Sequence, residues 1–151
     1  MKQSPILLMM VLRLIFSSAP TACARFQENH VQIQYGSQTP CWQNAYTQLA
    51  MNKCADADLR QSDADLNRTY QQVLSKYSND PIRIAQIKKA ETAWLAFRDA
   101  EIDALFPESS RLERGTVYPM CRAMHLTGIT VERTKALKAL LEHEEGDVCA
   151  P

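Results

Sequence analysis

Beyond its first 24 residues, the sequence has no apolar run long enough to cross a membrane as a helix. It also has no C-x-x-C pair, which argues against a zinc site. No serine or cysteine lies in a nucleophile motif. The sequence therefore predicts no transmembrane segment in the mature chain, no catalytic residue, no metal site and no cofactor.

Two classes of ligand are disfavoured by missing side chains. Basic residues are interspersed with acidic ones and do not alternate with aromatics, so no nucleic-acid-binding surface is predicted. Asp63, Asp65 and Asn67 are spaced like the start of a calcium loop. However, the sixth position is Arg68 where that loop needs glycine, and the twelfth is Leu74 where it needs glutamate. Calcium binding is therefore not predicted.

What the sequence does contain begins with an export signal. Lys2 precedes the apolar stretch "ILLMMVLRLIF", and Ala22-Cys23-Ala24 offers the small-x-small pattern that signal peptidase cleaves. We expect residues 1–24 to be a signal peptide removed after Ala24, which predicts a bacterial periplasmic or secreted protein. Lipid anchoring at Cys23 is the less favoured alternative, because "PTAC" lacks a leucine three residues before the cysteine.

The remaining 127 residues suit one domain. They hold 15 basic and 17 acidic residues, a formal net charge of −2. Their four cysteines, an even number in an exported chain, predict disulfide bonds; the four are Cys41, Cys54, Cys121 and Cys149. We expect a loose N-terminal arm at residues 25–40 and a single domain at residues 41–151.

The domain is predicted to be all-α, because helical periodicity dominates from Cys41 onward and no strand-like alternation interrupts it. Three main helices are expected, over about residues 42–77 with a bend near 54–57, from Pro81 with Asp80 as N-cap to just before Pro107, and over about 120–142 with a kink near Gly128. The short first connection predicts an antiparallel bundle with an N-terminal extension, stabilised by disulfides.

A polar network is predicted inside this bundle. Helical spacing places Asp63 on the inward stripe of the first helix and Arg98 on that of the second, where the guanidinium could hold the carboxylate. Asn67, Glu101 and Arg133 are expected as further members. We interpret the network as structural, fixing the register of the helices; the alternative is catalytic, with Asp63 and Glu101 as acid and base.

Several motifs resemble the LprI-like family of lysozyme-inhibitor domains. These are "MNKCA" at 51–55, the spacing of Asp65, Leu66, Asn67 and Tyr70, the segment "WLAFRD" at 94–99, and Cys121 followed later by Arg133. The resemblance covers about residues 41–141. It implies a small exported bacterial protein, not an enzyme, that binds a lysozyme or a similar cell-wall hydrolase in the envelope and inhibits it.

One departure from the family concerns the cysteines, because Ile102 stands where members often have a cysteine and Cys149 appears in the tail. In an up-down-up bundle the third helix starts beside the first, which favours Cys54–Cys121 and leaves Cys41–Cys149. Pairing of Cys41 with Cys54 stays open if the early segment folds back.

The longest internal connection, residues 107–119, is predicted to contact the partner, because long loops on rigid bundles often carry function. Its candidate contact residues are Glu108, Arg111, Glu113, Arg114 and Tyr118. Two alternatives remain open: an immunity protein against another periplasmic toxin, and an envelope enzyme using Asp63, Arg98 and Glu101. The sequence leaves the identity of the partner and the oligomeric state open.

Overall fold

The computed structural model describes residues 39–142. The predicted signal peptide, almost all of the predicted arm, Cys149 and the C-terminal tail lie outside this range. Its long helices are α3 (Gln48–Lys76), α4 (Pro81–Leu105) and α6 (Tyr118–Leu141), and the described part contains no strand. The short elements are α2 (Pro40–Gln43), η1 (Glu108–Ser110), α5 (Arg111–Arg114) and η2 (Gly115–Val117). The predicted all-α bundle of three main helices is confirmed.

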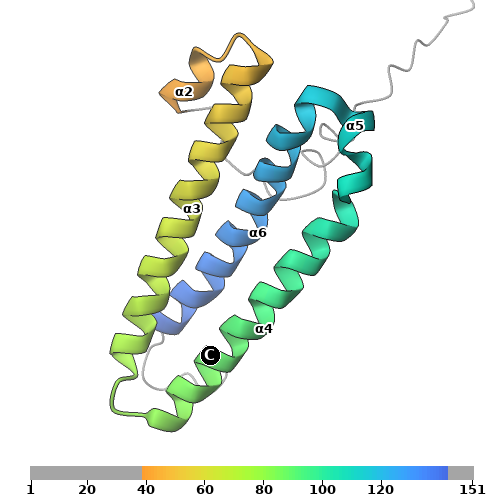
Figure 1. The fold of residues 1–151 in the computed structure, drawn as a ribbon. Coiled ribbons are helices and arrows are strands. Elements are labelled where there is room, and N and C mark those ends of the chain that lie inside the picture. The colour runs from red at the N-terminus through yellow and green to blue at the C-terminus, as the bar shows by residue number, and fades with distance from the viewer. Residues whose placement is uncertain (1–38, 143–151) are drawn as a thin grey trace, which may run out of the picture. The chain divides into compact units, whose positions relative to one another are not determined.

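The three long helices run up and down as predicted (Figure 1). α3 leads away from α2, a short turn reverses the chain into α4, and the segment with η1, α5 and η2 reverses it again into α6. α6 makes its main contact with α3, whereas α4 packs more sparsely against the pair. One side of α4 is therefore left without a neighbouring helix among residues 39–142.

Local side chains fix where the helices begin. The Asp80 carboxylate accepts a hydrogen bond from the backbone N–H of Arg83 at 2.9 Å, with Pro81 in the first turn, so this predicted N-cap is confirmed. The Thr47 hydroxyl accepts from the N–H of Ala50 at 3.2 Å and begins α3. The chain consequently bends at residues 44–47, and the bend predicted near residues 54–57 is wrong because α3 runs through that stretch without interruption.

Small side chains allow α3 and α6 to approach closely. On α3, Ala55, Ser62 and Thr69 are buried at seven-residue intervals; on α6, Ala123, Thr127, Thr130 and Thr134 are buried at intervals of three and four. The hydroxyls of Ser62, Thr127 and Thr134 donate to carbonyls of their own helices, which satisfies their hydrogen-bonding needs inside the interface. α6 likewise continues through the buried Gly128, where we expected a kink, because tertiary packing overrides weak local helix propensity.

Larger apolar side chains fill the end of the bundle near the α3–α4 turn. Leu66, Val73, Ile87 and Leu137 are buried there and bring all three long helices together. The Tyr77 hydroxyl donates to the carbonyl of Leu140 at 2.9 Å and ties the end of α3 to the end of α6.

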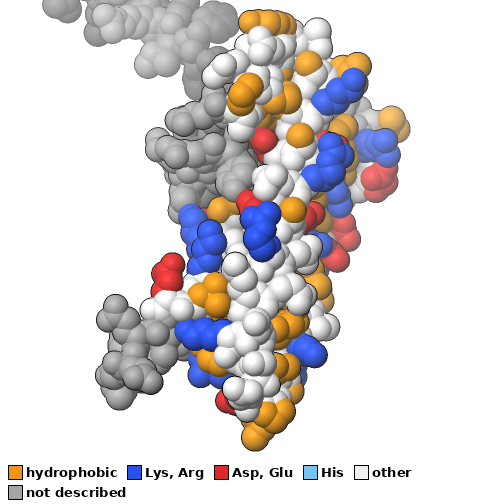
Figure 2. Space-filling view, turned by 90° about the vertical axis from the view of Figure 1, so that its left-hand side faces the viewer, with side chains coloured by type: hydrophobic (Ala, Val, Ile, Leu, Met, Phe, Trp, Pro, Cys, Tyr) orange, Lys and Arg blue, Asp and Glu red, His pale blue; other side chains and the backbone are white. Residues whose placement is uncertain are grey.

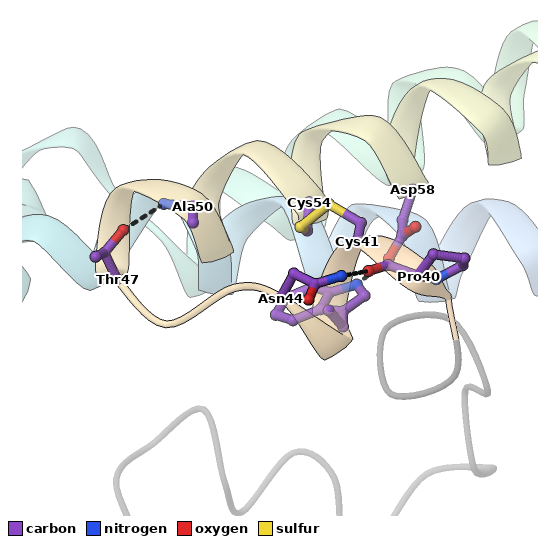
Figure 3. Close-up of a disulfide and its surroundings, with 8 residues drawn as sticks. Pro40, Cys41, Asn44, Thr47, Ala50, Cys54 and Asp58 are labelled. Carbon is purple, nitrogen blue, oxygen red and sulfur yellow. Dashed lines mark hydrogen bonds between the residues drawn. A yellow bond between two sulfur atoms is a disulfide. The ribbon is translucent and has the colours of Figure 1, made fainter.

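The disulfide pairing favoured from the sequence is wrong. Cys41 is bonded to Cys54, with their Cα atoms 5.7 Å apart, so α2 is held against α3 (Figure 3). The prediction failed because the break at residues 44–47 folds α2 back along α3, which brings Cys41 to Cys54 and removes Cys54 as a partner for Cys121. Cys121 is also disulfide-bonded, but not to Cys41 or Cys54, which are joined to each other. The predicted Cys41–Cys149 bond is therefore also wrong, because Cys41 is bonded to Cys54.

α2 is also held by polar contacts. The Trp42 indole N–H donates to the Asp58 carboxylate at 2.7 Å, and the Asn44 amide donates to the carbonyl of Pro40 at 3.1 Å (Figure 3).

Within residues 39–142, no helix combines the length and apolar character needed to cross a membrane.

Candidate functional site

The segment between α4 and α6, which we call the projecting segment, is held by contacts at its two ends. Phe106 and Tyr118 close its base: their rings meet edge to face, and the Tyr118 hydroxyl donates to the carbonyl of Phe106 at 2.7 Å. Gly115 has a φ of 58°, which a glycine adopts without strain and which lets α5 turn into η2. Between these supports, the side chain of Leu112 is 93% exposed.

The charged residues of this segment are mostly satisfied within it. Glu108 and Arg111 form an ion pair at 2.9 Å. Arg114 donates to the carbonyl of Leu105 at 3.3 Å, and its guanidinium lies 4.9 Å from the Phe106 ring centre. Glu113 is exposed. The segment that carries Leu112 therefore also carries side chains of both charges.

Tyr118 is only 5% exposed. Its ring belongs to the core beneath the segment and not to the outer surface, where its sequence position led us to expect it. The reason is that α6 begins at Tyr118, two residues earlier than predicted, which turns this side chain into the bundle.

The start of α3 lies beside the same segment. The Asn52 amide donates to the carbonyl of Thr116 at 3.0 Å, and the Gln48 amide lies 3.7 Å from the sulfur of Met120. Here Tyr46 of the α2–α3 turn is 84% exposed, and Leu49 in the first turn of α3 is 65% exposed. The α2–α3 turn, the start of α3 and α5 lie at the same end of the bundle (Figure 1). We call the exposed residues that they carry, Tyr46, Leu49 and Leu112, the apolar end surface.

A groove of about 450 Å³ opens at this end. Its walls come from α3, the end of α4, η1, α5 and the start of α6. Acidic and basic side chains share its lining: Asp56, Asp103, Glu108, Arg111 and Arg122. Such a mixed lining suits the polar side chains of a protein partner more than a single small charged ligand. The face shown in Figure 2 likewise carries side chains of both charges among scattered hydrophobic ones.

The polar network predicted from the sequence is partly brought together near the middle of the bundle. Arg98 lies 3.6 Å from the Asp63 carboxylate and 3.2 Å from that of Asp99, and its guanidinium is 5.3 Å from the Trp94 ring centre. Asp63 lies at the edge of the helix interface, with 44% of its side chain exposed, and not inside the core as we expected. Burial raises the pKa of Asp63, and the positive charge of Arg98 partly opposes that shift.

Arg133 pairs with Glu91, which is not one of the residues predicted to form the polar network. It binds Glu91 with two donors, Nε at 2.9 Å and Nη2 at 2.8 Å, and this pair is mostly buried. The Trp94 ring lies 5.8 Å from the Arg133 guanidinium, between this pair and Arg98. Glu91 belongs to the same helical stripe as Trp94 and Arg98, so the spacing along α4 could have identified it.

The other two predicted members lie apart from these ion pairs. Asn67 is exposed on α3, and Glu101 is half-buried on α4. Neither Asp63, Arg98 nor Glu101 lines the groove. At mid-bundle, Arg98–Asp63 joins α4 to α3 and Arg133–Glu91 joins α6 to α4.

In residues 39–142, no three His, Cys, Asp or Glu side chains are grouped so as to hold a metal ion. His125 is buried with its ring 5.7 Å from that of Phe106, in the core beneath the projecting segment.

Comparison with known proteins gives a family and a relative. No solved structure matches the chain. The sequence is 32% identical over 117 residues to an uncharacterized protein of Rhizobium meliloti (strain 1021), covering 70% of this chain and 82% of that protein. The family model described as "Lysozyme inhibitor LprI" matches residues 41–137, a stretch that contains α3, α4 and most of α6. The chain therefore belongs to the LprI family of lysozyme inhibitors.

Proposed function

We propose that this protein is an exported binding protein of the bacterial envelope that inhibits a lysozyme or a similar cell-wall hydrolase by direct protein–protein contact. Support for the class of activity comes from membership of the LprI family. One observation carries the proposed mode of binding: the large apolar side chain of Leu112, on the projecting segment, is 93% exposed. Burial of an exposed leucine side chain in a pocket of the partner favours binding by about 1.5–3 kcal/mol, because it removes apolar surface from water.

The surroundings of Leu112 suit this role. Tyr46 and Leu49 extend the apolar end surface, and Tyr is a residue type enriched at protein–protein interfaces. The ion pair of Glu108 with Arg111 and the anchored Arg114 restrict the segment before binding, which reduces the entropy lost in the complex. Many lysozymes are basic, and the formal charge of −2 on residues 25–151 favours encounter with a basic partner.

The test is a cell-wall lysis assay with lysozymes of different types. The purified, oxidised protein is added in increasing amounts, and the loss of turbidity of a bacterial suspension is followed. We expect stoichiometric, dose-dependent slowing with at least one lysozyme. If no lysozyme in the panel is slowed, the inhibitor proposal is rejected, and an immunity role against another envelope toxin takes its place.

Two matched variants locate the contact. Leu112→Asp should weaken inhibition at least tenfold, because it places a charge where an apolar anchor enters the target. Ile82→Asp is the control, since Ile82 is a similarly exposed apolar residue, 72% exposed, at the opposite end of α4. It should inhibit like the wild type. Equal inhibition by both variants would show that Leu112 does not contact the target, although the protein still inhibits the lysozyme.

A further inference from the structure

The outward face of α4 carries an exposed apolar seam. Its six members follow one another at alternating intervals of four and three residues, and all are exposed. The first, Gln86, is polar, and the other five are apolar: Ala90, Ala93, Phe97, Ala100 and Ala104. This 4-3 spacing is that of the contact positions in paired helices. Phe97 at its centre is 56% exposed.

A separate apolar stripe of α4 faces the bundle. Ile87 and Ile102 of this stripe are buried against the other helices. At 3.6 residues per turn, the seam lies about 120° around the helix from these two residues, so α4 carries two apolar stripes, and an apolar stripe on a helix is ordinarily covered. Within the described residues no helix covers the Phe97 face, so α4 has the pattern of a helix with a second neighbour.

The charges beside the seam indicate which neighbour fits. Apart from Glu91 and Arg98, which take part in the mid-bundle network, the basic residues of α4 lie in its first half and the acidic ones in its second. The basic residues nearest the seam are Arg83 and Lys89, and the acidic residues nearest it are Glu101 and Asp103, because helical spacing turns Lys88 and Asp99 to the other side of α4. Another α4 aligned in parallel would bring like charges together, whereas an antiparallel α4 brings each basic half against an acidic half.

We propose that the protein forms a twofold-symmetric dimer in which the seams of two α4 helices pack antiparallel. Pairing the seam about its midpoint sets Phe97 of one copy against Ala93 of the other, so that a large side chain faces a small one. The same register sets Ala90 against Ala100 and brings Lys89 near Asp103. Because the interface is isologous, each contact occurs twice. This inference does not rest on the proposed inhibitory function.

The first test measures mass in solution. Sedimentation of the oxidised wild type over a wide concentration range should show a species of twice the chain mass. Phe97→Glu should yield monomer, because two buried carboxylates would meet the alanines of the other seam. Leu112→Glu is the matched control: it replaces another exposed apolar residue, outside α4, and should remain dimeric. Circular dichroism of each variant checks that the helices are retained. A monomeric wild type, or a dimer that Phe97→Glu leaves intact, overturns the proposal.

Cross-linking tests the direction of the pairing. The double variant Ala90→Cys with Ala100→Cys should form a covalent dimer on oxidation. Within one chain these positions lie about 15 Å apart along the helix, too far to bond with each other. Each single variant should remain uncross-linked, because the antiparallel register keeps identical positions apart. Efficient cross-linking by Ala90→Cys alone would indicate parallel pairing and overturn the antiparallel arrangement.

Discussion

At the scale of single residues, the most enclosed ion pair in residues 39–142 joins α4 to α6. The Glu91 side chain is 11% exposed and that of Arg133 is 18% exposed, and they are connected by a hydrogen bond from Arg133 Nε and an ion-pair contact from Nη2. Charges this far from water are favourable only while paired, since an isolated one keeps its desolvation cost. The contrast with Arg60 and Asp56, an exposed pair on α3, allows the effect of burial to be measured.

Glu91→Ala should lower the free energy of unfolding by roughly 3 kcal/mol, because it leaves Arg133 unpaired. Asp56→Ala should change it by less than about 1 kcal/mol, because its pair is exposed. Urea unfolding followed by circular dichroism measures both. Similar losses for the two variants would show that the Glu91–Arg133 pair is effectively solvated. The double variant Glu91→Leu with Arg133→Met should recover much of the loss, because it removes both charges.

Asp63 links stability to pH. Because burial raises its pKa above the ordinary value of 3.8, the folded protein holds this proton to a higher pH than the unfolded chain does. The contribution of Asp63 to stability is therefore present below pH 3.8 and is lost as the pH rises through the folded-state pKa.

Asp63→Asn should remove this decline and should leave the protein at neutral pH at least as stable as the wild type. Arg98→Met should steepen the decline, because it removes the positive charge that opposes the pKa shift. Unfolding free energies measured in a pH series test both variants. If Asp63→Asn leaves the pH dependence of the unfolding free energy unchanged, burial does not raise the pKa of the Asp63 carboxyl group.

At the scale of the elements, the contact between α3 and α6 depends on small side chains. Ala55 is 1% exposed, and a larger residue there must push the helices apart or adopt a strained rotamer. Ala57, two residues along the same helix, is exposed. Substituting each alanine by leucine therefore distinguishes two contributions to the free energy of unfolding. One is the cost of crowding the α3–α6 interface at Ala55, and the other is the effect of leucine on the helix at Ala57.

Ala55→Leu should lower the free energy of unfolding by about 1–3 kcal/mol. Ala57→Leu should change it little, since leucine is nearly as good a helix former as alanine. Chemical unfolding of the two variants beside the wild type provides the comparison. Equal stability of the two would mean that α3 and α6 are not closely packed at Ala55.

At the scale of the whole molecule, a domain of this size has a modest core, and covalent links add to its stability. The Cys41–Cys54 bond spans a sequence separation of 13 and keeps α2 folded back on α3. Much of its stabilising effect is expected to come from restricting the unfolded chain.

Replacing both Cys41 and Cys54 with alanine should lower the free energy of unfolding by about 3 kcal/mol, the value expected for a loop of this length. The native fold should persist, because the contact between α3 and α6 is independent of α2. Urea unfolding together with far-ultraviolet circular dichroism measures both effects. Loss of the helical signal without denaturant would mean that α2 is required for folding of the bundle.

Much of the fold followed from local sequence, whereas the candidate site followed less completely. Asp80 and Pro81 marked the start of α4, and Pro107 marked its end, because capping and proline effects act within a few residues. The projecting segment was located by its length, yet Leu112 was not singled out. Exposure depends on what lies around a side chain, and sequence spacing alone does not report it.

The sequence by itself determined the helical class, the order of the long helices and most of their boundaries, since periodicity, caps and breakers are local properties of the chain. Tertiary structure decided which groups meet: Cys41 with Cys54, Arg133 with Glu91, and Tyr118 inside the bundle. Each of these depends on where a helix starts or how two helices are rotated. An error of two residues turns a helical side chain by about 200°, enough to exchange core for surface.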